Sequence, residues 1–421
     1  MKYHEQVEYI RELSRKLKGL AAREENQKKK KMWSDHNELN TGVHPLLWVC
    51  PDDDGAWLEL VPEERLRCGD QDLRVLENQL LKYLYQGEYF HDDFVFEPAV
   101  YMNIPGEYTG YLYGHQNQNT AWGVNIVKKE VGKKAYHLEN FLKTDEDYEK
   151  LFDHEVDFRP DYSEWKRLEE KYKDVVNGII EVQFNLPYSV LVQSHLIELV
   201  HLRGLEELMY DVYDDPERLH QVLHHMAVSK ARLLTRLEEK HMLFDNRTNI
   251  YTGSGGLGYT NDPQKASEDV LLKDMWGFAD AQEFSYVSGE MFEEFAIRNQ
   301  KIGLNMFGMG CYGCCEPLDN KYDAIFHHIT NLRRISVSPW SDVKRAVENI
   351  GTRAIFSWKP NPVRICNGFD EEETYQWLCE VARLTRGCVT EIILKDLRTC
   401  GGTNHNLVRF IDLVDRAFDR K

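Results

Sequence analysis

Short β-like runs alternate with longer helical patterns through most of this 421-residue chain. Strands that alternate with helices are typical of parallel βα units, because each parallel connection has to cross back over the sheet. About eight such units in one chain favour the α/β class and a (β/α)8 TIM-type barrel over an open sheet. The candidate strands are "LLWVC" at 46–50, "FVFEPAVYMNI" at 94–104, "GIIEVQF" at 178–184, "TNIYTG" at 248–253, "GLNMFG" at 303–308, "RRISVS" at 333–338, "RAIFSW" at 353–358 and "VTEIILK" at 389–395.

The first forty residues have a different pattern, that of one charged helix. Their apolar side chains fall at helical spacing, at Val7, Ile10, Leu13, Leu17 and Leu20. We therefore predict an N-terminal helical arm at 1–40 and the barrel at 41–421. The lysine run from Lys28 to Lys31 could bind phosphate, but charge runs more often face water.

Charge and cysteine content narrow the functional class. With 52 basic and 70 acidic residues the chain has a formal net charge of −18, which argues against nucleic acid or an anionic membrane surface as its main partner. The nine cysteines are an odd number, and the N-terminus lacks an apolar signal segment, so we expect a reducing, cytoplasmic setting. No apolar run reaches the roughly 18 residues that a membrane span requires, so we expect a soluble protein.

Barrel enzymes gather their active sites at the C-terminal ends of the strands. Four successive candidate strands are followed there by polar or unusual clusters, "GMGCYGCCEP", "SVSPWSD", "SWKPNP" and "LKDLRT". We predict that these clusters form the walls of one pocket. The substrate-binding candidates, together with two from earlier segments, are His195, Gln282, Tyr312, Trp340, Lys359, Asn361, Lys395 and Asp396.

The densest of these clusters contains Cys311, Cys314 and Cys315, followed by Glu316. Thiolates are soft ligands that suit zinc, and a Cys-x-x-Cys spacing is compatible with a metal or redox pair. Adjacent cysteines can reach one ion only if the loop turns sharply, which the neighbouring glycine and proline would allow. The alternative is that these cysteines simply fill the core.

Acid–base candidates lie in "DMWGFADAQEF". If this segment is helical, Asp280 and Glu283 share a face and could act as an acid–base pair, whereas in an extended segment they face opposite ways. A solvated acidic helix start is the alternative. In "QSHLIELVHLRG", His195, Glu198 and His201 would be neighbours on a helix, although a surface helix often shows such a set by chance.

Two further patterns have a functional and a structural interpretation. Lys359, and the pair Lys395 and Asp396, stand at predicted strand ends, where they could bind a substrate carboxylate or phosphate, or form a structural ion pair. The glycine-rich "YTGSGGLGYTND" at 251–262 lacks the residues of a P-loop, so it predicts either a close backbone approach to a ligand or a flexible turn.

Two long segments resemble the uroporphyrinogen decarboxylase superfamily. They are "DMWGFADAQEFSYVSGEMFEEF", and "CCEPLDNKYDAIFHHITNLRRISVSPWSDVKRAVENIG" followed by "FSWKPNP", and the resemblance spans about residues 45–420. It implies a (β/α)8 barrel, usually homodimeric. The superfamily includes porphyrinogen decarboxylases and methyltransferases that exchange methyl groups with a corrinoid protein or a thiol.

Departures from the family pattern separate these branches. The decarboxylases carry an arginine-rich N-terminal motif, whereas this chain has "WVCPDDDGAWLEL", whose acidic residues would repel a tetrapyrrole with many carboxylates. In the zinc-dependent methyltransferases a His-x-Cys motif follows the corresponding strand. Here Cys314 matches its cysteine while Tyr312 replaces the histidine, so Cys311, Cys315 or Glu316 would have to complete an altered zinc set.

The leading hypothesis is a methyltransferase that moves a methyl group from a small methylated substrate to a corrinoid protein. Asp280, Glu283 or Glu316 would then protonate the leaving oxygen or nitrogen. One alternative is a decarboxylase or lyase of a small carboxylic acid, with Lys359 and Lys395 binding the carboxylate. Another is a non-catalytic binding barrel whose cysteines belong to the core.

Overall fold

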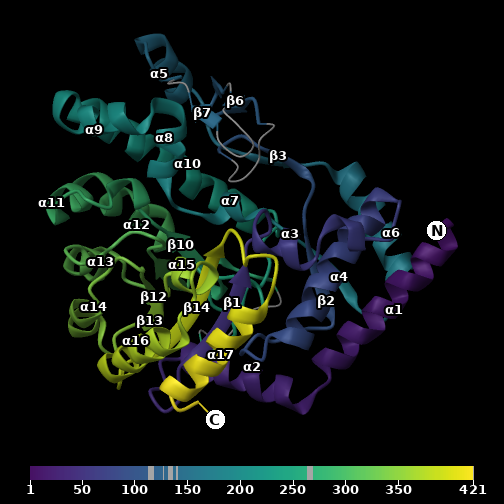
Figure 1. Cartoon of the computed structure of the whole chain (residues 1–421). Helices are drawn as coiled ribbons and strands as arrows, with labels where there is room; N and C mark the ends of the chain where they lie inside the picture. Colours follow the sequence, from purple (N-terminus) through teal and green to yellow (C-terminus); the bar gives the residue numbers. More distant parts are fainter. Residues whose placement is uncertain (112–117, 127, 131–135, 139–140, 263–268, 421) are drawn as a thin grey trace.

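The fold is α/β and is built on a curled, parallel, six-stranded sheet. A computed structural model describes residues 1–111, 118–126, 128–130, 136–138, 141–262 and 269–420 (Figure 1). The strands are hydrogen-bonded in the order β1–β14–β13–β12–β11–β10, and every neighbouring pair is parallel. They are β1 (Leu46–Pro51), β10 (Trp276–Ala279), β11 (Met309–Tyr312), β12 (Leu332–Val337), β13 (Ile355–Trp358) and β14 (Thr390–Leu397).

Two further parallel strands, β2 (Ala99–Asn103) and β9 (Glu181–Asn185), pair with each other in a separate sheet. Within the described residues no backbone ladder joins this pair to the six-stranded sheet. The predicted eight-stranded barrel is therefore present only in part, as a six-stranded half-barrel sheet beside a two-stranded pair.

Two predicted strands were wrong, and one strand of the six-stranded sheet was missed. Residues 248–253 form no strand, and Tyr251 makes a single isolated bridge to Leu257. Residues 303–308 contain the end of α12 (Arg298–Leu304) and a turn, and β11 begins only at Met309. The missed strand is β10, whose four residues are all buried. Short apolar runs do not distinguish a strand from the end of a buried helix, which explains the displaced prediction.

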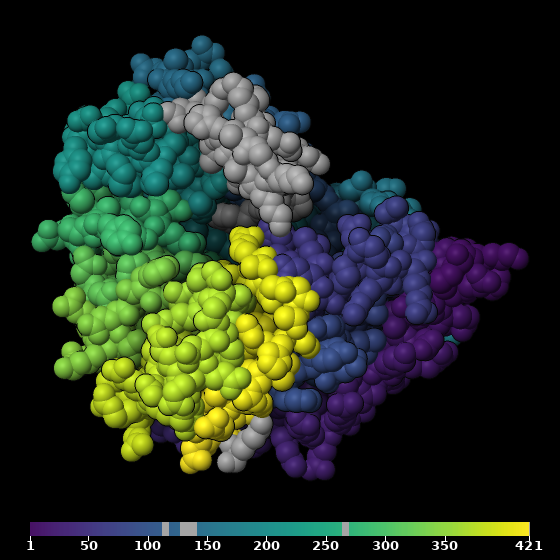
Figure 2. All heavy atoms as spheres, in the orientation of Figure 1, coloured from purple at the N-terminus to yellow at the C-terminus, as the bar shows by residue number. Residues whose placement is uncertain are grey.

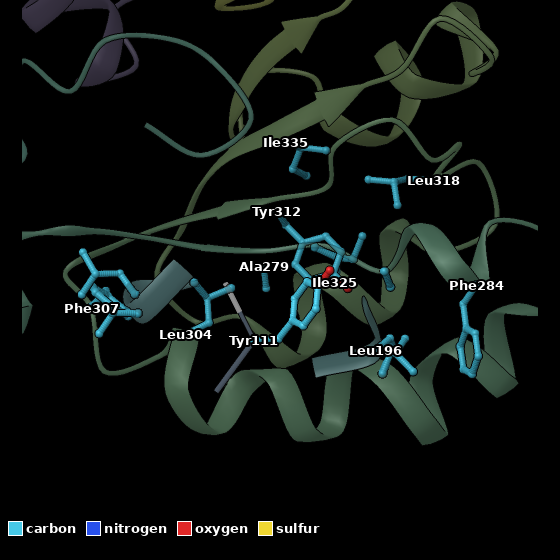
Figure 3. Close-up of a cluster of buried hydrophobic side chains, with 14 of the residues drawn as sticks. Tyr111, Leu196, Ala279, Phe284, Leu304, Phe307, Tyr312, Leu318, Ile325 and Ile335 are labelled. Carbon is cyan, nitrogen blue, oxygen red and sulfur yellow. The ribbon is translucent and has the colours of Figure 1, made fainter. Parts of the chain in front are cut away.

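Helices follow the strands of the six-stranded sheet and flank it, as the green and yellow ribbons of Figure 1 show. A short helix α11 (Gly289–Met291) leads through a π-helical segment, Phe292–Ile297, into α12. The later helices are α13 (Tyr322–His328), α14 (Val343–Ile350), α15 (Pro362–Cys366), α16 (Glu371–Leu384) and α17 (His405–Ala417). Buried side chains from these helices and the sheet form the main core, including Leu304, Tyr312 and Ile325 (Figure 3).

The N-terminal segment forms two helices, α1 (Tyr3–Ala21) and α2 (Glu24–Asn37). The buried face of α1 packs against α4 (Gln71–Tyr89) and α6 (Tyr162–Val176), and α1 forms the purple flank of the molecule in Figure 2. The lysine run lies on α2, where Lys28 and Lys29 pair with acidic residues one turn earlier.

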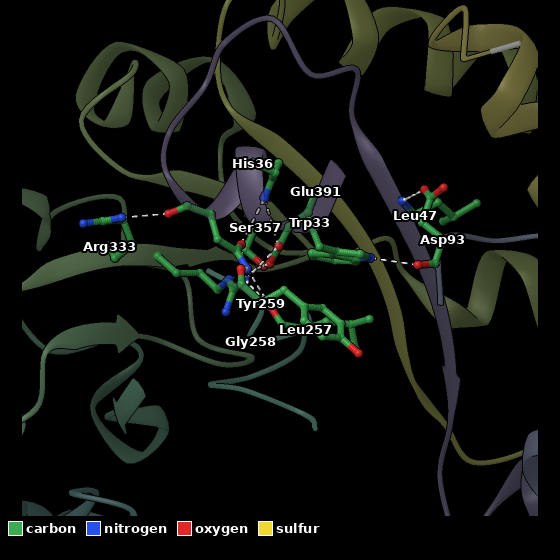
Figure 4. Close-up of polar contacts among 12 residues, drawn as sticks. Trp33, His36, Leu47, Asp93, Leu257, Gly258, Tyr259, Arg333, Ser357 and Glu391 are labelled. Carbon is green, nitrogen blue, oxygen red and sulfur yellow. Dashed lines mark hydrogen bonds and ion pairs between the residues drawn. The ribbon is translucent and has the colours of Figure 1, made fainter. Parts of the chain in front are cut away.

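A buried polar network ties α2 to the middle of the sheet (Figure 4). Arg334 on β12 forms an ion pair with Glu391 on β14 at 3.0 Å, and its guanidinium also donates to Oδ1 of Asn37 at 2.9 Å. Ser357 on β13 donates to Glu391 as well. A buried charge is tolerated only when it is paired and hydrogen-bonded, so these contacts hold α2 and three strands together.

The middle of the chain adds a helical layer and small ladders beside the sheet. Its longest helix is α10 (Pro216–Glu239), which packs against α8, α9 and α12. The remaining helices are α3 (Ala56–Leu60), α5 (Asp145–Phe152), α7 (Tyr188–Leu191), α8 (His195–Arg203) and α9 (Leu205–Asp214). The short strands are β3 (Gly106–Tyr108), β4 (Thr120–Ala121), β5 (Val124–Asn125), β6 (Lys128–Glu130), β7 (Tyr136–Leu138) and β8 (Phe158–Pro160). Among the helices described, none is both long enough and apolar enough to cross a membrane.

Candidate functional site

A cavity of about 370 Å³ lies at the C-terminal ends of β10 and β11. We call it the acid chamber, because the carboxyl group of Asp280 lines it. Its lining residues are Tyr111, Tyr188, Val192, Ser194, Ile197, His201, Tyr251, Gly253, Ser254, Phe278, Asp280, Gln282 and Cys314. Its place at the ends of parallel strands is where α/β folds usually bind ligands.

Asp280 directly follows β10 and is 5% exposed. Its backbone N–H donates to Oγ of Ser194 at 2.9 Å, and its Oδ2 accepts a hydrogen bond from the Gln282 amide at 2.7 Å. Burial raises the pKa of Asp280, while hydrogen bonds from Ser194 and Gln282 partly offset the rise. The chamber therefore contains a carboxyl group that holds its proton more strongly than a solvated aspartate.

Glu316 ties the ends of β10 and β11 together. Its Oε1 accepts the N–H of Ala281 at 3.0 Å, and its Oε2 accepts the N–H of Cys314 at 2.9 Å. Burial, followed by the neighbouring Asp280, raises the pKa of Glu316 to about 7. Glu316 was predicted as a catalytic acid, but both of its oxygens hold backbone groups and it does not line the chamber.

Glu283 lies in a single 3-10 turn, Gln282–Phe284, so the segment is neither the helix nor the extended strand considered from the sequence. Burial and the charge of Asp280 raise the pKa of Glu283 to about 8. Its Oε2 is buried without a hydrogen-bond partner in the described chain. Asp280, Glu283 and Glu316 thus form an acid cluster in which each carboxyl group has a pKa above its ordinary value.

Two successive hydrogen bonds connect the backbone of Asp280 to Tyr312 through Gln300. The Tyr312 hydroxyl donates to Oε1 of Gln300 at 2.6 Å, and the Gln300 amide donates to the backbone oxygen of Asp280 at 2.5 Å. Tyr312 is 1% exposed and does not line the chamber, so it is placed to position Asp280 and not to touch a ligand. Ser194 and Gln300 were missed, because nothing in the sequence connects a polar residue on a remote helix with this strand end.

Cys314 and Cys315 lie together beside Lys395, with their sulfurs 3.6 Å apart. The Lys395 ammonium donates to Sγ of Cys314 at 3.3 Å and to Sγ of Cys315 at 3.7 Å. Cys315 in turn donates to Oδ2 of Asp396 at 3.2 Å. The hydrogen bond with Cys315, and then burial, raise the pKa of Cys314 well above its usual value, while Lys395 opposes this rise.

Lys395 and Asp396 are consecutive, yet both side chains reach the thiol pair. The register between β1 and β14 shifts at this point, from Val49 opposite Leu394 to Pro51 opposite Leu397. Asp396 adopts a left-handed backbone with φ of 57°. An irregularity of this kind redirects side chains that would alternate in a regular strand.

The three cysteines do not form one metal site. Cys311 is buried in β11, where Arg334 donates to its sulfur at 3.7 Å, and Lys395 occupies the position beside the other two thiols. In the part of the chain that the structure describes, no three His, Cys, Asp or Glu side chains lie where they could hold one metal ion. The residues present therefore do not fit the predicted zinc.

Other predicted residues lie outside the acid chamber. His195 is buried at the start of α8; burial, and then the charge of Lys230, lower its pKa well below the usual value. Trp340 is 66% exposed, and Asn361 caps α15 by accepting the N–H of Val363 at 3.0 Å. Lys359 is buried against Ser357, and desolvation lowers its pKa to about 8. Of the eight substrate-binding candidates, Gln282 alone is among the described residues that line the chamber.

Two features of the chamber were only partly anticipated. His201 lines it, and its ring packs against Tyr111 with centroids 3.9 Å apart. The glycine-rich segment also lines it through Gly253 and Ser254. Gly253 has a φ of +65°, and a Cβ there would lie 2.6 Å from Cβ of Cys311, so glycine is required for this loop to approach the sheet.

No protein-family model matches the sequence, and no curated protein matches it. Among solved structures, the chain is similar to a methyltransferase from Methanosarcina mazei, with 11% sequence identity and a TM-score of 0.46. The match covers 93% of this chain and 98% of that one. A similarity this low does not transfer that protein's activity to this chain, and membership of the uroporphyrinogen decarboxylase superfamily stays a prediction.

Proposed function

We propose that this chain is an enzyme that transfers a methyl group from a small methylated compound, with Asp280 as the acid. The observation that supports this most is the proton-holding carboxyl of Asp280 on the wall of a chamber at the strand ends. Ser194, Gln282 and the Tyr312–Gln300 chain fix its position. A positioned acid of this kind typically accelerates proton transfer by about 10²–10⁴-fold.

In the proposed step, an acceptor attacks the methyl carbon with its own electron pair. The bond between that carbon and the substrate oxygen or nitrogen breaks, and the electron pair stays on the oxygen or nitrogen. The Asp280 proton moves to that atom, which leaves as a hydroxyl or an amine. Asp280 becomes a carboxylate and regains a proton from solvent before the next turnover.

The acceptor in this proposal is a corrinoid carried by a partner protein. Its support is the resemblance of the "DMWGFADAQEFSYVSGEMFEEF" segment to the uroporphyrinogen decarboxylase superfamily, which includes methyltransferases that use a corrinoid protein. A homodimer is proposed on the same basis. Glu316 has a positioning role in this scheme, because it holds the backbone on both sides of the chamber.

The geometry gives less support to a decarboxylase of a small acid. Lys359 and Lys395, the residues expected to bind the substrate carboxylate, line neither this chamber nor its neighbour described below. The Lys395 ammonium already donates to the thiol pair, and it forms an ion pair with Oδ1 of Asp396 at 3.2 Å. An anionic substrate would also lie beside Asp280, whose ionisation it would oppose.

The test is a methyl-transfer assay with reduced cobalamin as the acceptor and a panel of small uncharged O-methyl and N-methyl compounds. We expect wild-type turnover on at least one compound and a loss of about 10²-fold or more in Asp280→Asn. Asp323→Asn, which changes an exposed carboxylate on α13, is the matched control and should keep full activity. Absence of wild-type turnover across the panel, or equal rates in Asp280→Asn, would overturn the proposal.

A further inference from the structure

A second cavity, of about 300 Å³, adjoins the acid chamber at the C-terminal ends of β2 and β9. We call it the neutral chamber, because none of the described residues that line it carries a formal charge. Tyr188, Val192, Tyr251, Gly253 and Phe278 line both chambers and form their common wall. The two chambers are therefore immediate neighbours.

Tyr188 is one of the aromatic residues of this common wall. Its hydroxyl donates to the backbone oxygen of Gly253 at 2.6 Å, and its ring centroid lies 6.1 Å from that of Phe278. The residue is nevertheless 42% exposed. Because Tyr188 lines both cavities, its ring can offer an apolar face to an occupant of either one.

Two asparagines lie side by side in the lining of the neutral chamber. Asn103 and Asn185 are register partners at the last positions of β2 and β9, and both line the neutral chamber. Within the described chain neither side-chain amide has a hydrogen-bond partner; Asn185 is buried, whereas Asn103 is exposed. By contrast, the amide of Asn246 in the same lining is fully used, since it both donates to and accepts from the backbone of Trp276 at 2.9 Å.

These features together define a ligand class. Aromatic walls favour a flat, apolar ring, whereas paired free amides favour a polar group that both donates and accepts hydrogen bonds. A charged group would lose its hydration in a chamber that offers no counter-charge. We infer that the neutral chamber binds an uncharged aromatic ring bearing a carboxamide or hydroxyl group, which Asn103 and Asn185 recognise.

This inference names a substrate class for the proposed function, and it rests on that function for the orientation of the ligand in the two chambers. With the polar group on Asn103 and Asn185, the far side of the ring faces the common wall, and a methoxy or N-methyl group there enters the acid chamber beside Asp280. The substrate class is then an uncharged aromatic methyl ether or methylamine. The cavity volumes of about 300 and 370 Å³ leave room for one ring with small substituents in each direction.

The test is calorimetric binding to the whole chain, without any methyl acceptor, using four probes of similar shape. They are 4-methoxybenzamide, 4-methoxytoluene, 4-methoxybenzoate and 4-methoxybenzylamine. We expect 4-methoxybenzamide to bind at least 10-fold more tightly than each of the others, because the amides discriminate by hydrogen bonding and the chamber holds no charge. Tighter binding of the anion or the cation would overturn the inference.

Substitutions of the two asparagines distinguish a loss of ligand recognition from a failure to fold. Asn103→Leu and Asn185→Leu should each lower the affinity for 4-methoxybenzamide toward that for 4-methoxytoluene, and leave the affinity for 4-methoxytoluene unchanged or improved. Retained binding of 4-methoxytoluene shows that the variants fold. Asn349→Leu, on a helix that lines neither chamber, is the control. Unchanged affinity for the benzamide in both variants would refute the role of the amides.

The same probes distinguish failure of this inference from failure of the proposed function. Selective binding of 4-methoxybenzamide without methyl transfer would leave the neutral chamber assigned and overturn the methyltransferase. Methyl transfer confined to charged substrates would support the methyltransferase and overturn the assignment of the neutral chamber.

Discussion

The Gln282 amide donates to Oδ2 of Asp280 across 2.7 Å, and both side chains line the same chamber. This donor stabilises the ionised form of the carboxyl and so lowers its pKa, against the larger effect of burial. The pH at which Asp280 loses its proton is therefore set by a balance in which Gln282 is one identifiable part.

Gln282→Leu should move the alkaline limb of the methyl-transfer rate to higher pH. The hydrogen bond from Gln282 lowers the Asp280 pKa, so its loss raises that pKa further. The pH–rate profile measures this shift. Gln376→Leu, at an exposed amide on α16, should leave the profile unchanged. A limb that stays in place or moves to lower pH would contradict Asp280 as the acid.

Glu316→Leu should destabilise the fold by about 2–5 kcal/mol, because the buried N–H groups of Ala281 and Cys314 lose their acceptor. Urea denaturation monitored by circular dichroism gives the change in free energy of unfolding. Glu380→Leu removes an exposed carboxylate from α16 and should change stability by less than about 0.5 kcal/mol. Equal stabilities for the two variants would show that the Glu316 contacts contribute little.

Glu283→Gln should make the protein less sensitive to alkaline pH. The pKa of Glu283 is raised from 4.5 to about 8 in the folded chain, so the folded state holds one more proton than the unfolded state between these values. Stability is consequently lost as pH rises through this window, with a slope of at most about 1.4 kcal/mol per pH unit. The glutamine has no proton to lose, so the advantage of the variant should grow from pH 5 to pH 8.

Urea unfolding at a series of pH values measures that difference. Glu290→Gln is the control, because Glu290 is exposed and should alter stability equally at every pH. A Glu283→Gln curve parallel to that of wild type would mean that Glu283 ionises normally in the folded protein.

The thiol pair predicts a characteristic pattern of alkylation by iodoacetamide. Cys315 is the largest influence that raises the pKa of Cys314, so Cys315→Ala should increase the labelling rate of Cys314 at pH 7.5 severalfold. Lys395 lowers that pKa, so Lys395→Met should slow the same reaction. Mass spectrometry of the labelled peptides gives the rates, with Cys379 on α16 as an internal reference. Identical rates in all three proteins would exclude the coupling.

Much of the fold could be predicted from the alternation of strands and helices. The predicted strands at 46–50, 333–338, 353–358 and 389–395 fall on β1, β12, β13 and β14. The pattern failed where a strand is very short or joins a helix, since β10 and β11 have only four residues each. It also could not show that β2 and β9 pair with each other apart from the main sheet, because strand pairing depends on long-range packing.

For the site, the sequence singled out some residues that the structure brings together and others that it does not. Asp280, Gln282 and Cys314 were singled out, and they lie together on one chamber. Trp340 and Asn361 follow strand ends too, yet one is exposed and the other caps a helix. Position after a strand does not fix the direction of a side chain. No local sequence pattern identified Asn103 and Asn185 as site residues. They become neighbours only through the pairing of two strands about eighty residues apart in the sequence.

The buried contacts between α2 and the sheet have a consequence for anyone who wishes to shorten this chain. A version that begins at residue 41 would lack Asn37, and with it an oxygen 2.9 Å from the Arg334 guanidinium in the middle of the sheet. It would also uncover the place of Trp33, which is fully buried and donates to the backbone of Asp93 at 2.7 Å. Tags and fusions are better placed before α1 than in place of these two helices.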